Sequence, residues 1–549
     1  MRNIIGMNKY IFKNVKYIRN FLIVLGILSV IATITGIIIP YFNGVFVDVL
    51  IYTQDFNSII KLTMLIITIG VVDVVFNYIY NLTYIKVLNK VVYRTKMQLI
   101  EHLRRVSYLR LSKLNPVYLN QRINIDVIAV FQFFIENYIT CFMMVIVIIL
   151  EGYMVFRVNV LIGGLVVLFV PVYVVIYLYL KRPLYEKNIY YKEEQNIFFH
   201  KINDQFALLK SIKINADFAK NNEAMDNSFR VFLKKTIDFN KVSFLFSSCD
   251  SVVSLLFRSI MYIIAGCEII KKNLTVGEFT MINAYFSLLL TQIRYFFNLG
   301  KKYQDAKSSY DRIEELLHIP KESNGNQVVD QINEITLDDI SFRYDLNSTM
   351  LLEKVSYKFE KGKIYGISGV NGVGKSTLIN ILIGIINEDV SGEVKYGSNK
   401  LQDMDMYEVR REHIAVMSQE FESGFDVTVS DLLCANYPGF GQDGIDKSLK
   451  QIGDLNLLFD NEMSLADLWR KRIKDLSGGE KQKVSLVWCF LKDADVLILD
   501  EPTANMDRKS IEVVKRILKD MVKEKIIIVV SHDKSLFEVC DKQIDLSSN

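Results

Sequence analysis

The residues best placed to do chemistry lie in the stretch GVNGVGKST, residues 369–377. It has the form G-x-x-x-x-G-K-S and follows the apolar run KIYGIS, so it predicts a strand, a glycine-rich turn and a helix in succession. Such a turn points backbone N–H groups at phosphate oxygens, while Lys375 would neutralise the β- and γ-phosphates and Ser376 would bind Mg²⁺. The predicted nucleotide-binding residues of this loop are Gly369, Asn371, Gly372, Gly374, Lys375, Ser376 and Thr377.

Two further motifs supply carboxylates and a second helix start. The run VLILDEPT predicts an apolar strand that carries Asp500 to the metal, followed at once by Glu501, which could polarise an attacking water as general base. In DLSGGEKQ, residues 477–479 open a helix that could bind phosphate. The same residues also fit an ordinary capping box, with Ser477 as the cap and Glu480 three positions on, and the pattern alone leaves both interpretations open.

The first half of the chain is unusually apolar and contains long hydrophobic windows. Of 549 residues, 51% are hydrophobic and the mean hydropathy is positive, which is more apolar than a soluble globular chain requires. Apolar windows of spanning length lie at residues 20–42, 58–82, 133–156, 159–180, 244–270 and 276–299. We therefore predict six spans, all before residue 305.

Charge and periodicity orient these spans. The long connections 83–132 and 181–243 are rich in Lys and Arg, which places them in the cytoplasm, and their helical periodicity predicts stalks with reversals near residues 115–121 and 208–216. The basic N-terminal segment, with Arg2, Lys9, Lys13, Lys16 and Arg19 and no acid, is expected to be a retained amphipathic segment at the membrane surface and not a cleaved signal.

After Pro320 a polar stretch predicts a linker at 321–332, and from residue 333 short apolar runs alternate with helical segments, as in a mainly parallel sheet with crossover helices. Ligands of such sheets bind at the carboxyl ends of the strands. The expected fold class is a multidomain membrane protein. An all-α six-helix transmembrane domain at residues 1–320, with long cytoplasmic extensions, precedes an α/β P-loop ATPase domain at residues 333–549.

Charge and cysteine usage exclude some other classes. Net charge is only +4 from 65 basic and 61 acidic residues, which gives no case for a nucleic-acid partner. The six cysteines show no C-x-x-C pair and are expected to be reduced thiols. Because no cysteine precedes Cys141, we expect no leader-peptidase domain before the first span.

In this order and at these intervals, the phosphate loop, LSGGE, LILDE and a following SHD resemble the nucleotide-binding domain of ATP-binding cassette (ABC) proteins. Residues 15–320, including NLTVGEFT and SSYDRIEELLHIP, are similar to the six-helix half of ABC exporters. The resemblance implies that Tyr344 stacks on adenine, that Gln419 reaches the metal and the attacking water, and that His532 holds the γ-phosphate as a catalytic partner of Glu501. It further implies contacts to a facing subunit from Ser477, Gly478, Gly479 and Asp507.

The resemblance also implies the function. In this family LSGGE of one chain covers the γ-phosphate held by another chain, so a dimer is expected. Since Glu501 and LSGG are both intact, a homodimer is favoured over a heterodimer. We expect ATP- and Mg²⁺-dependent export across a bacterial cytoplasmic membrane, with the ATPase domain in the cytoplasm and an antimicrobial or modified peptide as cargo. Multidrug or lipid export is the alternative, and a membrane ATPase that regulates a partner without cargo of its own is the alternative of another class.

Two features depart from the family pattern. Glu480 stands where Gln is commoner, and SLADLWRKRIKDLSGG lacks the Gly- and Glu-containing segment usual before the signature in exporters. The first should be tolerated, whereas the second leaves open how the cassette communicates with the long loops.

Polar and aromatic residues inside the spans allow two interpretations. Ionisable side chains there either line a translocation path or lie at the interface, with Asp73 and Arg258 the deepest. These residues are Asp73, Glu151, Asp250, Arg258, Glu268 and Arg294. Aromatic side chains of the second and sixth spans could form a cargo pocket or simply pack and face lipid; they are Phe76, Tyr78, Tyr80, Tyr285, Phe286, Tyr295, Phe296 and Phe297.

Overall fold

The structure is a computed structural model that describes residues 2–53, 55–114, 116–345, 349–418, 427–436, 458–459, 465–504 and 506–546. The chain divides into two compact units. The first contains Met1–Ile100 and Val117–Leu316, and the second contains Glu101–Pro116 and Leu317–Asn549.

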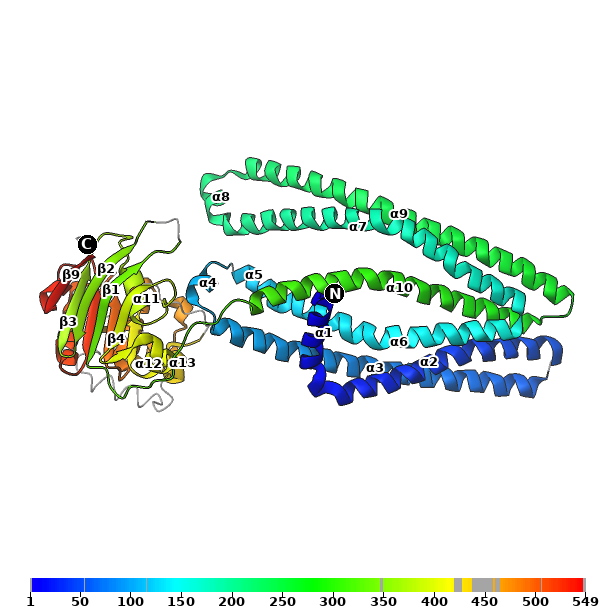
Figure 1. The fold of residues 1–549 in the computed structure, drawn as a ribbon, viewed down its shortest axis with the longest axis horizontal. Helices are drawn as coiled ribbons and strands as arrows, with labels where there is room; N and C mark the ends of the chain where they lie inside the picture. Colours follow the sequence, from blue (N-terminus) through cyan, green and yellow to red (C-terminus); the bar gives the residue numbers. More distant parts are fainter. Residues whose placement is uncertain are drawn as a thin grey trace. The chain divides into compact units, whose positions relative to one another are not determined.

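The first unit is helical (Figure 1). Its helices are α1 (Arg2–Val15), α2 (Arg19–Asp48), α3 (Phe56–Arg104), α5 (Pro116–Gln121), α6 (Val127–Val158), α7 (Val160–Ala207), α8 (Leu209–Asn215), α9 (Phe218–Ile270) and α10 (Val276–Leu317). Apolar side chains on several faces of the long helices favour burial against each other or against lipid. The tight turn between α6 and α7 is fixed by Asn159, whose Oδ1 accepts hydrogen bonds from the backbone N–H groups of Leu161 and Ile162.

Each predicted apolar window falls on one long helix: α2, α3, α6, α7, α9 or α10. Among the described residues, four helical stretches are long and apolar enough to cross a membrane. They are Gly6–Thr53, Phe56–Arg104, Tyr118–Val158 and Phe218–Ile270. The count of six spans stays a prediction for α7 and α10.

One of the two chain reversals at the stalk tips lies where it was predicted, and the other begins earlier. Helix α8 reverses the chain between α7 and α9, as expected for residues 208–216, and Ala216 ends it with a positive φ of 54°. The first reversal begins earlier than predicted, and residues 116–121 of the predicted stretch form helix α5 within it. The chain already turns after α3 ends at Arg104, because Val106 pairs with Lys321 and the Glu322 N–H donates to the Arg105 carbonyl.

The early turn changes the domain boundary. It brings helix α4 (Tyr108–Ser112) into the second unit, and the first unit ends at Leu316. The predicted transmembrane domain, residues 1–320, therefore differs from the compact unit by this tip segment and by a few residues at its end.

The second unit contains two sheets (Figure 1). Its strands are β1 (Glu334–Phe342), β2 (Leu352–Glu360), β3 (Lys363–Ser368), β4 (Ser391–Tyr396), β5 (Asn399–Lys400), β6 (Ile414–Met417), β7 (Val496–Asp500), β8 (Ile526–Val530) and β9 (Lys542–Asp545). Its helices after α10 are α11 (Lys375–Leu382), α12 (Met406–Glu412), α13 (Val429–Asn436), α15 (Leu465–Arg470), α16 (Gly478–Leu491) and α17 (Arg508–Met521). One sheet is parallel with strand order β6-β7-β8-β3-β9, and the other is antiparallel with order β2-β1-β4-β5.

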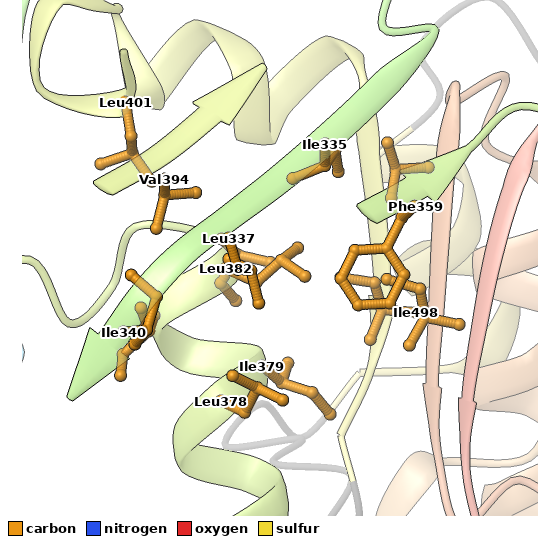
Figure 2. Close-up of a cluster of buried hydrophobic side chains, with 14 of the residues drawn as sticks. Ile335, Leu337, Ile340, Phe359, Leu378, Ile379, Leu382, Val394, Leu401 and Ile498 are labelled. Atoms are coloured by element: carbon orange, nitrogen blue, oxygen red, sulfur yellow. The ribbon is translucent and has the colours of Figure 1, made fainter. Parts of the chain in front are cut away.

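Helix α11 is held by the apolar cluster between the two sheets. Figure 2 shows its side chains Leu378, Ile379 and Leu382 among Leu337 of β1 and Ile498 of β7. Each of these side chains is almost fully buried, and burial of one such side chain is worth about 1.5–3 kcal/mol. Because α11 begins at Lys375, this packing fixes the helix end that carries the predicted phosphate loop.

Candidate nucleotide-binding site

The loop between β3 and α11 has the backbone that a phosphate site needs. Gly372 and Gly374 have φ values of 83° and 105°, which residues with a Cβ atom rarely adopt. A Cβ on Gly374 would also lie 3.0 Å from Leu352 Cδ2. Lys375 Nζ donates to the Gly369 carbonyl at 2.7 Å, so the ammonium group is folded over the centre of its own loop.

Strand register brings the first carboxylate to this loop. Asp500 of β7 and Ile367 of β3 both pair with Val530 of β8. The carboxyl ends of these three strands therefore lie side by side at the same end of the sheet. Ser376 Oγ donates to Asp500 Oδ2 at 3.1 Å. Burial raises the pKa of Asp500 and the nearby charge of Glu501 adds to this rise, while the Ser376 hydroxyl opposes it.

A hydroxyl and a carboxylate side by side form a hard-oxygen donor set that fits Mg²⁺, which is commonly bound by one or two protein groups together with substrate phosphates. No group of three or more His, Cys, Asp or Glu side chains suited to a metal occurs in the described part of the chain. A metal here would therefore depend on Ser376, Asp500 and the nucleotide.

Glu501 has a strained and closely held backbone. Its φ is 51°, an unusual value for a residue with a side chain. Its N–H donates to the Val530 carbonyl at 2.8 Å, and its own carbonyl accepts from Gln482 Nε2 at 2.6 Å. Gln482 was not predicted as a site residue, and no sequence signal separates it from other polar residues of α16.

The two carboxylate oxygens of Glu501 differ in their surroundings. Oε2 lies 3.4 Å from the Ser531 hydroxyl and 3.3 Å from the His532 N–H, both of which can donate to it. Oε1 is buried and, within the described part of the chain, has no hydrogen-bond partner. One oxygen is thus held in place and the other is left to accept a proton from a water molecule.

His532 connects the loop to this carboxylate. Its Nε2 lies 3.0 Å from Lys375 Nζ, 2.9 Å from Asn371 Oδ1 and 3.8 Å from Glu501 Oε1. The imidazole therefore lies between the loop, where a terminal phosphate could bind, and the carboxylate of Glu501.

These groups surround one cavity of about 480 Å³. Its lining contains most of the predicted residues, namely Tyr344, Asn371, Gly372, Gly374, Lys375, Ser376, Thr377, Asp500, Glu501 and His532, together with Leu351. The Tyr344 hydroxyl is 2.9 Å from Thr377 Oγ1, and its half-exposed ring meets Phe342 edge to face. Adenine stacking by Tyr344 stays a prediction, and Gln419 lies outside the described residues.

The signature residues form a separate feature. Ser477 caps α16: its Oγ accepts from the Glu480 N–H at 3.3 Å, while its own N–H donates to Glu480 Oε2 at 2.7 Å. The capping-box interpretation is therefore correct. Ser477, Gly478 and Gly479 are not among the described residues that line the cavity above. Because the Ser477 oxygen already accepts, its hydroxyl proton remains available to a phosphate outside the chain.

Glu480, the departure from the family pattern, has a defined role in this cap. Its carboxylate also pairs with Lys471 at 3.0 Å. The backbone N–H of Ser477 and, more weakly, Lys471 lower the pKa of Glu480. A carboxylate near a helix N-terminus is favourable, so the substitution is compatible with the helix start.

Asp507 likewise caps a helix of its own chain. Its side chain accepts from the Ser510 N–H at 3.4 Å and lies 3.8 Å from Lys483 Nζ. The hydrogen bond from the Ser510 side chain lowers the pKa of Asp507. Its carboxylate is still 58% exposed, and the predicted contact with a facing subunit stays a prediction.

The ionisable residues of the predicted spans have partners within the first unit. Asp250 pairs with Arg294 at 2.7 Å, and Gln292 Nε2 donates to Glu151 Oε2 at 3.0 Å. Asp73 accepts from Thr35, Arg258 NH2 lies 3.3 Å from Ser287 Oγ, and Glu268 pairs with Lys271. All of these pairs except Glu268–Lys271 connect two helices of the first unit.

Of the aromatic residues considered for a pocket, Tyr285 and Phe286 are fully buried packing residues, and the Tyr285 hydroxyl donates to the Ile37 carbonyl at 2.7 Å. Tyr78 is 64% exposed on the helical unit, as a lipid-facing residue would be. The packing interpretation therefore holds for these residues.

Fold and site together define a membrane-anchored P-loop ATPase. Two family models match the chain: ABC transporter transmembrane region over residues 22–293 and ABC transporter over residues 352–504. The structure also resembles a bacterial Atm1-family ABC exporter solved with ATP bound, with a TM-score of 0.80 and 16% identity over 96% of this chain and 94% of that one. The chain therefore belongs to the ABC transporter family and combines a transmembrane region with an ATP-binding cassette.

Curated relatives match a smaller part of the chain. The ATP-dependent lipid A-core flippase of Vibrio parahaemolyticus serotype O3:K6 is 26% identical over 53% of this chain and 50% of its own length. The lactococcin-A transport/processing ATP-binding protein LcnC of Lactococcus lactis subsp. lactis is 26% identical over 69% of this chain and 53% of its own length. The chain thus spans about half the length of the curated relatives it matches.

Proposed function

We propose that two copies of this chain form an ATP-driven exporter with two composite hydrolysis sites. This proposal rests on the observation that, within one chain, the signature serine does not line the cavity of the phosphate loop. The phosphate loop, Asp500, Glu501 and His532 share one cavity, whereas the signature serine caps a helix that does not line it. A second copy facing the loop would supply Ser477 and the N-terminus of α16 to the terminal phosphate.

Within such a site each residue has one task. Lys375 and the loop N–H groups bind the phosphate chain, and Ser376 and Asp500 would hold Mg²⁺, which when bound stabilises charge on the phosphate oxygens. Glu501 takes the proton of the attacking water through Oε1, which has no hydrogen-bond partner among the described residues, while Ser531 and the His532 backbone hold Oε2. His532 lies beside the transferred phosphate.

Helix α4 would pass the resulting motion to the transmembrane helices. Leu109 packs against the cassette core, and Arg110 Nε lies 3.0 Å from Glu388 Oε2. Lys113 adds an ion pair with Asp345 at 2.8 Å. Since α4 directly follows α3, a displacement of the cassette surface would act on the end of that long helix.

For the cargo we propose a peptide. The alignment to LcnC covers 390 residues, more than the predicted cassette contains, and so includes part of the transmembrane region where cargo is met. The mesentericin-Y105 transport/processing ATP-binding protein MesD of Leuconostoc mesenteroides matches over a similar length, 69% of this chain. The alignments to lipid A-core flippases cover 53% or less, which makes a lipid the second candidate.

A complementation experiment tests the composite site. Lys375→Ala damages the loop side of the composite site, and Ser477→Arg damages the signature side. In a homodimer of either variant neither site works. When both variants are co-expressed, a mixed dimer has one site with both defects and one intact site. With random pairing half of the dimers are mixed, so about a quarter of all hydrolysis sites are intact. ATP hydrolysis at the level of the single variants would contradict the homodimer proposal.

Transport is tested by ATP-dependent uptake into inside-out vesicles, with Glu501→Gln vesicles as the blank. Hydrophobic and cationic peptides are compared with lipophilic dyes and a fluorescent lipid. Peptide uptake alone supports the proposal, and uptake of dye or lipid alone moves the function to multidrug or lipid export. Hydrolysis without uptake of any probe would favour an ATPase that regulates a partner.

A further inference from the structure

The first unit contains a cavity of about 370 Å³ between helices α2, α3, α6 and α10. Its wall is mixed: methionine and aliphatic side chains such as Met143, Met144 and Val147 alternate with polar ones. Every lining residue falls within a predicted span. A cavity of this size is at the lower end of small-ligand pockets, so it could hold one side chain or one end of a larger cargo.

Two buried polar groups meet in this wall. Glu151 of α6 is 1% exposed and Gln292 of α10 is 6% exposed, and the Gln292 amide nitrogen donates to Glu151 Oε2 at 3.0 Å. Because Glu151 accepts this hydrogen bond, the Gln292 amide faces the acid with its N–H₂ end. The other end of the amide, Gln292 Oε1, is buried and has no hydrogen-bond partner in the described part of the chain.

The lining is also unbalanced in charge. Glu151 is the one ionisable acid among the described residues that line the cavity, and none of them is Lys, Arg or His. A buried carboxylate without a cation is costly in a membrane interior, as is an unpaired amide carbonyl. Both costs would fall if a group with several N–H donors and a positive charge entered.

From this arrangement we propose that the cavity binds a primary ammonium group of the cargo, through Glu151 and Gln292 Oε1. An ammonium group offers three donors and one charge, which matches one carboxylate and one carbonyl oxygen. Its methylene stem would lie against Met143, Met144 and Val147, since lysine stems pack well on apolar surface. A lysine side chain or a free amino terminus of a peptide has this chemistry. The inference rests on the proposed export of peptides.

The test uses purified full-length protein in lipid nanodiscs and two fluorescent hydrophobic tetrapeptides, both blocked at their termini. One carries a single lysine and the other carries acetyl-lysine at the same position; acetylation removes the charge and two of the three N–H donors and lengthens the side chain by an acetyl group. The wild-type protein should bind the lysine peptide about 10-fold more tightly, as a hydrogen bond to a charged group allows. Glu151→Gln should bring the ratio of the two dissociation constants close to one.

Two further variants separate recognition from damage to the fold. Glu136→Gln makes the same change on the same helix at a residue that pairs with Lys302 and does not line the cavity, so the preference should persist. Gln292→Leu keeps the acid but removes the carbonyl oxygen, and should reduce the preference even if Glu151→Gln fails to fold. ATP binding by each variant shows that the protein is intact.

The outcomes distinguish this site from the export proposal. Equal binding of the two peptides by wild type, no binding of either, or an unchanged preference in Glu151→Gln or Gln292→Leu would overturn the ammonium site. Uptake of both peptides into vesicles without such a preference would leave peptide export standing and reject the site. A preference that depends on Glu151, without ATP-driven uptake, would leave the site standing and reject export of these peptides.

Discussion

Replacing Glu501 by Gln is expected to stop hydrolysis while leaving ATP binding intact. The change keeps the size of the side chain and leaves one oxygen that can still accept from the Ser531 hydroxyl and the His532 N–H, at the 3.4 Å and 3.3 Å positions of Oε2. The backbone at Glu501 is held independently by Val530 and Gln482. The geometry of the phosphate loop should therefore not change.

What the variant loses is the basic oxygen. In the native chain Oε1 is buried with no hydrogen-bond partner among the described residues, so a water there would transfer its proton to Glu501 alone. General-base catalysis contributes roughly 10²–10⁴-fold to a rate. We expect kcat to fall by about 10³, equivalent to about 4 kcal/mol of transition-state stabilisation.

The assay measures phosphate release and, separately, the affinity for a fluorescent ATP analogue. Glu524→Gln is the matched control, because Glu524 is exposed and lies just before the amino end of β8, at the opposite sheet edge from the site. The control should retain both properties. Hydrolysis by Glu501→Gln within a few-fold of wild type would refute the general-base assignment, and loss of ATP affinity would refute the claim that Glu501 acts only on the water.

Four other substitutions test separate parts of the site. Lys375→Ala should weaken binding of the ATP analogue by about 10-fold or more, because hydrogen bonds to charged groups are worth roughly 1.5–3 kcal/mol; unchanged affinity would contradict the phosphate-loop assignment. Gln482→Leu frees the Glu501 carbonyl and should lower kcat several-fold with little change in KM for ATP, so a change in KM alone would argue against a positioning role. Since burial raises the pKa of Asp500, its ionisation costs stability that is present at low pH and lost as pH rises through the folded-state pKa. Asp500→Asn should therefore raise the Tm of the nucleotide-free protein at neutral pH, relative to wild type, while abolishing Mg²⁺-dependent hydrolysis, and an equal or lower Tm would count against this account. Arg110→Glu should leave hydrolysis largely intact but reduce vesicle uptake, with recovery in Arg110→Glu/Glu388→Arg; uptake unaffected by the single change would remove α4 from the coupling route.

Much of the site could be predicted because each of its motifs is short and stands at the carboxyl end of a strand. The loop at residues 369–377 must follow a strand and open a helix, and Asp500 must end an apolar strand. In a parallel sheet both positions reach the same edge whatever connects them. Sequence and structure therefore agree where local pattern and sheet geometry suffice.

Other features depend on contacts between distant segments, which a single sequence does not encode visibly. The hydrogen bond from Gln482 to the Glu501 carbonyl and the early turn after α3 are of this kind, since each arises from the docking of two elements. Likewise, hydropathy marks Glu151 as unusual but not its partner Gln292, 141 residues away. The two interpretations of Ser477 are compatible, because its oxygen caps the helix while its hydroxyl proton could be donated to a phosphate of another chain.

Three features of the cassette are unfavourable in the isolated chain, and bound ATP with Mg²⁺ would relieve two of them. Asp500 is buried enough to raise its pKa, Glu501 has a φ of 51°, and Lys375 donates to carbonyls of its own loop in place of a stronger acceptor. Mg²⁺ would relieve the first, and phosphate oxygens would replace weak acceptors in the third, whereas neither would relieve the strained backbone of Glu501, which we propose directs its carboxylate toward the attacking water. Nucleotide binding thus stabilises the groups that hold substrate but not the one that performs chemistry, so the cassette can close tightly on ATP without losing the strained geometry that hydrolysis needs.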